Sequence, residues 1–78
     1  MRCTRMTIED YRVQFGWSKR RMAKEAGIDT NTLKSAIDSN PVYRATVGKI
    51  AHAINQELAR RGQPTIKYTD LDNVKFAD

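Results

Sequence analysis

The chain has 78 residues, of which 40% are hydrophobic and 29% charged, and its formal net charge is +5. This length allows one small domain, and the lack of an apolar run of about 18 residues excludes a membrane-spanning helix. We see no secretory leader, and the one cysteine, Cys3, allows no internal disulfide, so we expect a soluble, cytoplasmic protein.

The charge is divided unevenly along the chain. Residues 1–68 hold 13 Lys and Arg against 6 Asp and Glu, whereas residues 69–78 hold one Lys and three Asp. A basic body favours a polyanionic partner, because each phosphate that is neutralised releases condensed counterions. Since many basic proteins bind no nucleic acid, the charge alone does not decide for this function.

Cap residues predict the first two helices. Thr7 and Asp10 have the spacing of a capping box, and apolar residues recur at helical spacing over Ile8–Phe15, where we expect the first helix. Ser18 is the next residue suited to an N-cap, and Gly27 supplies a left-handed residue at which a helix ends. A short second helix is therefore expected between these two positions.

Two further helices are expected in the middle of the chain. Asp29 is again suited to an N-cap, and an apolar stripe follows it, so the third helix is predicted over about Thr30–Ser39, before a break at Asn40-Pro41. Beyond a loop that contains Arg44, apolar residues keep one helical face from Val47 onward. This fourth and longest helix is expected to continue up to Gly62.

The C-terminal tail, residues 62–78, has an ambiguous periodicity. Thr65–Tyr68 alternates in the manner of a short strand, which would suit a β-hairpin turning at Asp72-Asn73. Thr69 would equally cap a final helical turn through Leu71, giving a short fifth helix. The expected fold is therefore an all-α, compact domain of four to five helices, with a short extended or β segment near the C-terminus as an open alternative.

The tight turn between the second and third helices is the arrangement that presents a helix to a DNA groove. The run MAKEAGIDTNTLKSAID, residues 22–38, resembles the helix-turn-helix of the lambda-repressor-like family of phage repressors and Cro proteins, also called XRE-type. TVGKIAHAI, residues 46–54, resembles the fourth helix of that family. The resemblance covers Thr7 to Leu58 and implies a DNA-binding domain over residues 7–61. One departure is that Ala36 and Ile37 stand where the family has a large aliphatic residue and a polar residue, so a slightly rotated third helix is expected.

The third helix is the expected reading element. A projection about Leu33 as the inward direction places polar side chains on the opposite side. Asn31 pairs well with adenine and Lys34 donates to guanine, so these two are predicted to read bases, assisted by Thr30 and Ser35. The alternative is a merely solvated helix face, which the helix-turn-helix context disfavours.

Basic residues near this element are expected to contact phosphates. The first turn of the second helix carries cations, although the helix dipole disfavours them there by about 0.3 to 1 kcal/mol each. Phosphates docked at this terminus would offset that cost through charge and backbone N–H donors. Arg2 and Arg5 belong to a flexible basic arm, residues 1–6, that would follow or enter a groove. The predicted phosphate contacts are Ser18, Lys19, Arg20, Arg21 and Arg44.

No constellation of catalytic residues is visible in the sequence. The chain lacks a nucleophile–base pair and a phosphate-cradling Gly loop, and His52 lies off the apolar face of its helix without suitable neighbours. We therefore expect neither an enzyme, a metal site nor a cofactor.

The expected function is sequence-specific binding of double-stranded DNA by a transcriptional regulator, a repressor of phage or bacterial type. One small module reads few base pairs, so a homodimer on a palindromic operator is expected. The apolar residues of the tail are assigned to its interface; the alternative is that they cover the protomer's own core. A second functional hypothesis is an antitoxin or protein-interaction adaptor on the same fold.

Overall fold

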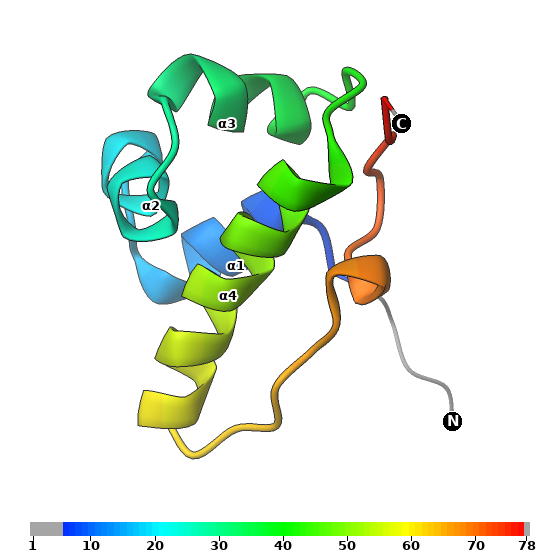
Figure 1. Cartoon of the computed structure of the whole chain (residues 1–78). Coiled ribbons are helices and arrows are strands. Elements are labelled where there is room, and N and C mark those ends of the chain that lie inside the picture. Colours follow the sequence, from blue (N-terminus) through cyan, green and yellow to red (C-terminus); the bar gives the residue numbers. More distant parts are fainter. Residues whose placement is uncertain (1–5, 78) are drawn as a thin grey trace.

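The computed structural model describes residues 6–77, which fold into α-helices and one 3-10 turn (Figure 1). The fold is all-α, as expected, since strand pairing within these residues is limited to two isolated bridges. Arg2 and Arg5, and with them most of the predicted arm, lie outside the described residues. The elements are α1 (Ile8–Phe15), α2 (Lys19–Ala26), α3 (Thr30–Ile37), α4 (Arg44–Arg60) and the 3-10 turn η1 (Tyr68–Asp70).

Side-chain caps begin the first two helices where the sequence predicts them. The Asp10 N–H donates to Thr7 Oγ1 and the Thr7 N–H donates to Asp10 Oδ2, each at 3.0 Å, so the capping box is confirmed. Ser18 Oγ accepts the Arg21 N–H at 3.1 Å. Asp29 occupies the N-cap position of α3, but its side chain makes no capping hydrogen bond.

The predicted ends of α3 and α4 need correction. α3 ends at Ile37 rather than at Ser39, because Ser39 has φ +65° and the chain leaves the helix there. Arg44 is the first residue of α4 rather than part of a loop, since the carbonyl of extended Tyr43 already accepts the Val47 N–H at 3.1 Å. α4 ends at Arg60, before Gly62.

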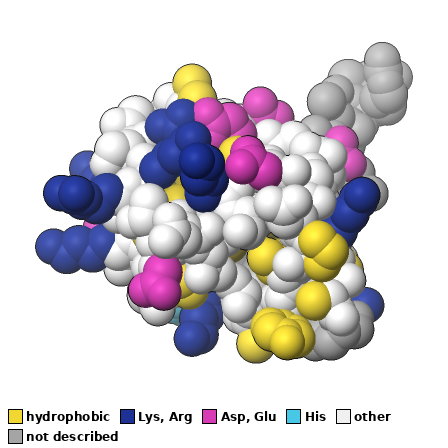
Figure 2. Space-filling model, turned by 90° about the horizontal axis from the view of Figure 1, so that it is seen from above, with side chains coloured by type: hydrophobic (Ala, Val, Ile, Leu, Met, Phe, Trp, Pro, Cys, Tyr) yellow, Lys and Arg dark blue, Asp and Glu magenta, His cyan; other side chains and the backbone are white. Residues whose placement is uncertain are grey.

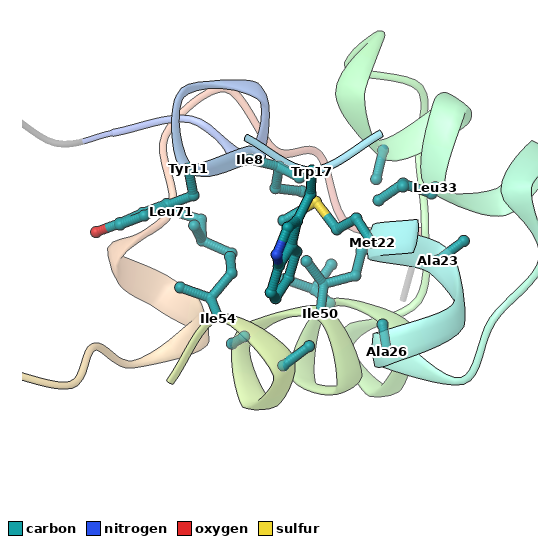
Figure 3. Close-up of a cluster of buried hydrophobic side chains, with 14 of the residues drawn as sticks. Ile8, Tyr11, Trp17, Met22, Ala23, Ala26, Leu33, Ile50, Ile54 and Leu71 are labelled. Atoms are coloured by element: carbon teal, nitrogen blue, oxygen red, sulfur yellow. The ribbon is translucent and has the colours of Figure 1, made fainter. Parts of the chain in front are cut away.

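One hydrophobic core joins the helices, and side chains from different elements converge in it (Figure 3). α4 packs against α1 and α2, while α3 packs against α1 and α2. Trp17 is buried, and its ring centroid lies 5.0 Å from that of Phe15, so both side chains pack the junction of α1 and α2. The largest fully buried side chains are Ile8, Met22, Leu33, Val47, Ile50 and Ile54.

The tail folds back onto its own protomer and forms no hairpin. The predicted strand over residues 65–68 is absent, and the chain instead makes the short turn η1 and then isolated parallel bridges to two distant residues. Leu71 is buried in the core (Figure 3), and four other apolar tail residues pack partly buried against it. The tail therefore follows the alternative in which it covers the protomer's own core.

Candidate nucleic-acid interface

The turn between α2 and α3 determines how α3 is presented. Gly27 has φ +73°, and across this turn the Ile28 N–H donates to the Ala23 carbonyl at 3.0 Å. Ala23 is buried, and its small side chain allows the two helices to approach closely. α3 buries Leu33 and Ala36, and its remaining side faces outward.

Polar side chains occupy the outer side of α3. Thr30, Asn31 and Lys34 are exposed, whereas Ser35 is half-buried and lines a depression together with Tyr43. Ile37 is also half-buried and packs against the core beside the small Ala36, as the departure from the family pattern suggests. Three of the four predicted base-reading residues therefore share one open surface, and Ser35 lies at its edge.

The depression beside Ser35 has a volume of about 380 Å³ and was not predicted from the sequence. It lies between α3 and the start of α4, and its lining includes Thr32, Thr46 and Tyr43, whose side chain is 64% exposed. An exposed aromatic residue directly before a helix was the available signal. This signal is missed when the fourth helix is predicted only from its apolar face, which begins at Val47.

The cations at the start of α2 are in different environments. Arg21 is engaged within the protein, since its guanidinium lies 5.2 Å from the Trp17 ring centroid and 3.9 Å from a Glu25 oxygen. Lys19 is half-buried, and Arg20 is exposed and has no hydrogen bond, ion pair or ring contact within the described residues. No acidic residue lies in this first turn. Of these three cations, Arg20 is thus the most available for a phosphate.

Arg44 lies at the start of α4, at the other end of the α3–α4 turn. Its guanidinium carbon lies 4.3 Å from the centroid of the Phe76 ring, which belongs to the tail. At such a distance the cation is attracted by the face of the ring. The tail therefore helps to orient a side chain that the sequence assigns to phosphate contact.

The other arginines of residues 6–77 are paired with carboxylates. Arg12 bonds to both oxygens of Glu9, and hydrogen bonding to Arg12 lowers the pKa of that carboxyl despite its partial burial. Arg61 donates to Glu57 at 2.8 Å and Arg60 at 2.9 Å, and the hydrogen bond from Arg61 is the main cause of the lowered pKa of Glu57. Two carboxylates thus offset part of these three positive charges.

Figure 2 looks onto α3 from above the view of Figure 1. Lys and Arg side chains gather on the side where α2 lies, uncharged polar surface occupies the middle, and hydrophobic side chains gather near the α3–α4 turn. Acidic side chains share this face, and both Asp29 and Asp38, which flank α3, are exposed. The face is therefore a polar helix bordered by cations rather than a uniformly basic surface.

Other kinds of site find little support in residues 6–77. These residues contain no group of three or more His, Cys, Asp or Glu placed to hold a metal ion, and His52 is exposed. None of their helices combines the length and apolarity needed to span a bilayer. Comparison of the chain with protein-family models, curated proteins and solved structures gave no match. What the site binds is therefore inferred from its own geometry.

Proposed function

We propose that this protein binds double-stranded DNA sequence-specifically, with α3 in the major groove, and that it regulates transcription as a repressor of phage or bacterial type. The observation that carries the proposal is the exposed polar side of α3, together with Arg20 on the adjacent helix α2, which has no partner within residues 6–77. A short helix held at a tight glycine turn, with its polar side outward, suits insertion into a groove. The resemblance to lambda-repressor-like proteins supports the same function.

The proposed roles follow from exposure and chemistry. Asn31 and Lys34 read base edges, since an amide can pair with adenine and an ammonium can donate to guanine. Thr30 contributes from the leading end of α3. Ser35, being half-buried, reaches the DNA only from the edge of the reading surface.

Positioning on the duplex is assigned to groups at two helix starts. Arg20 contacts a phosphate, and the first backbone N–H groups of α2, which the Ser18 side chain does not cap, add dipolar attraction at the same terminus. Lys19 assists with its partly exposed ammonium. Arg44 provides a second phosphate contact from the start of α4, and Arg21 contributes mainly through the field of its charge.

The test is selection from a random pool of double-stranded DNA, followed by binding measurements on the selected sequence. Asn31→Ala and Lys34→Ala are expected to weaken binding by roughly 1 to 3 kcal/mol and to relax preference at one base pair each. Lys67→Ala is the matched control, because this exposed lysine lies beside η1, away from α3 (Figure 1). Failure to enrich any sequence, or equal losses in all three variants, would refute the proposed site.

We also propose that the protein acts as a symmetric dimer on a palindromic site, because one reading helix contacts few base pairs. The tail is a weaker candidate for the interface than its sequence suggests, since Leu71 is buried within the protomer and Phe76 is half-buried. Sedimentation with and without the selected DNA tests the dimer. A monomer bound at a single, non-repeated site would rule it out.

A further inference from the structure

The segment that follows η1 runs back along the molecule to the turn between α3 and α4 (Figure 1). We propose that residues 71–77 form a strap that holds this turn in the conformation needed for DNA binding, and that Ser39 is a positioning residue within this contact. The inference rests on the proposed DNA-binding function. It adds residues that do not touch DNA but determine where α3 and Arg44 lie.

Backbone hydrogen bonds attach the strap at two places. At the α3–α4 turn the Val42 N–H donates to the Lys75 carbonyl at 3.0 Å, and the Ala77 N–H donates to the Val42 carbonyl at 2.7 Å. At the other end the Asp72 N–H donates to the Met6 carbonyl at 3.0 Å, next to the start of α1. The strap therefore connects the first residues of the domain with the turn that follows the reading helix.

Backbone strain is concentrated at one contact between the strap and the turn. Ser39 and Asn73 are the non-glycine residues with positive φ in the described part of the chain, at +65° and +59°. They lie 34 positions apart, yet Ser39 Oγ donates to the Asn73 carbonyl at 2.9 Å. One hydrogen bond thus joins two left-handed residues, and since this conformation is strained for serine but tolerated by asparagine, the contact is inferred to stabilise the backbone at Ser39.

The end of α3 explains why a serine at this position is informative. The Asn40 N–H donates to the Ser35 carbonyl at 2.9 Å and the Ser39 N–H donates to the Ala36 carbonyl at 3.2 Å, an arrangement whose left-handed residue is usually Gly. Glycine would relieve the backbone strain but has no hydroxyl group. Serine keeps the hydroxyl donor that reaches Asn73. The residue at this position therefore accepts backbone strain and gains a hydrogen bond to the strap.

The strap contacts the turn that follows the reading helix and the side chain of Arg44. Ser39, which donates a hydrogen bond to the strap, lies four residues after Ser35 of α3. The centroid of the Phe76 ring lies 4.3 Å from the guanidinium carbon of Arg44. Groups that act together on a ligand have to be held in place by surrounding contacts. Here the fixing contacts come from the opposite end of the chain.

Amide hydrogen exchange on the full chain reports strap opening without any DNA. Val42 and Ala77 are the reporters, and Ile54 in the core of α4 monitors global stability. Relative to Ile54, Ser39→Gly is expected to speed exchange at both reporters about fivefold, the factor that one hydrogen bond contributes. Asn73→Gly is the matched control: it also places glycine at a left-handed position of this contact but keeps the backbone acceptor. Equal exchange in the two variants would overturn the strap.

DNA affinity then tests the positioning role. The double variant Ser39→Gly/Ala77→Pro lacks two donors to the strap contact and is expected to bind the selected DNA at least about fivefold more weakly than Asn73→Gly. If wild type binds the DNA and the double variant binds it equally well, the positioning role is wrong while the proposed function stands. If wild type binds no DNA sequence, the proposed function fails, whereas the exchange measurement still decides whether the strap exists.

Discussion

Gly27 and Gly48 allow the same substitution to be tested in two backbone conformations. Gly27 has φ +73° in the turn that presents α3, whereas Gly48 lies within α4 and has no positive φ. A Cβ added at either position would meet no atom within 4 Å, so neither change causes a clash. Any difference between them therefore comes from the backbone.

The expected effects have opposite signs. Gly27→Ala should cost about 1 to 2 kcal/mol, because an L-residue is strained in the left-handed region. Gly48→Ala should stabilise the protein by about 1 kcal/mol, since alanine is the better helix former. At position 27, Asn should cost less than Ala, and β-branched Val should cost more than either.

Urea unfolding followed by far-ultraviolet circular dichroism measures these differences, provided that the slope with urea stays the same in all variants. Midpoints of Gly27→Ala and Gly48→Ala that shift in the same direction would refute the backbone explanation. The backbone explanation would also be refuted if the loss of stability at position 27 followed side-chain volume and Asn destabilised the protein as much as Val. The turn would then be held by contacts rather than by its conformation.

Further predictions concern the core, acid stability and phosphate contacts. Ile50 is fully buried, so Ile50→Ala should cost about 2 to 5 kcal/mol in urea unfolding. The Arg61 hydrogen bond lowers the pKa of Glu57 from its usual value of 4.5. The stability that this pair contributes is therefore present above pH 4.5 and is lost as the pH falls through the pKa of Glu57 in the folded state. Glu57→Gln should flatten this decline when unfolding is measured across acidic pH values. Arg20→Ala should reduce the slope of log K against log salt by about 1 and weaken binding to all sequences alike. Arg44→Ala and Phe76→Leu should weaken DNA binding less than additively, because both disrupt one contact.

Local signals explain why α1 and α2 were predicted to the residue. The hydrogen bonds by which Thr7, Ser18 and Gly27 cap these helices join residues at most four positions apart. Their effect can therefore be predicted without knowledge of the fold. The start of α4 carried no such signal, because Tyr43 caps it without a side-chain hydrogen bond. Asp29 makes no capping hydrogen bond either, but its residue type indicates the start of α3, whereas tyrosine gives no such indication, so the start of α4 is located only by the contacts of the folded structure.

The path of the tail depends on partners that are far away in the sequence. The residue pair Asp72-Asn73 suggests a hairpin turn, and Asn73 does have a left-handed conformation, but its carbonyl accepts a hydrogen bond from Ser39 and no second strand follows within the described residues. The apolar residues of the tail follow no regular alternation, because they cover a helical core rather than one face of a sheet. Half-burial of Ser35 has the same origin, since the depression beside it forms only when Tyr43 is brought next to α3.

The placement of charges, rather than their number, distinguishes the proposed DNA-binding face. Arg12, Arg60 and Arg61 carry the same charge as Arg20, but carboxylates of Glu9 and Glu57 bind them within the protein. A cation that is already paired must give up that pair before it can hold a phosphate, whereas Arg20 gives up only water. The number of basic residues is therefore larger than the number of phosphate contacts. We expect the slope of log K against log salt concentration to correspond to a few phosphate contacts, fewer than the number of Lys and Arg residues.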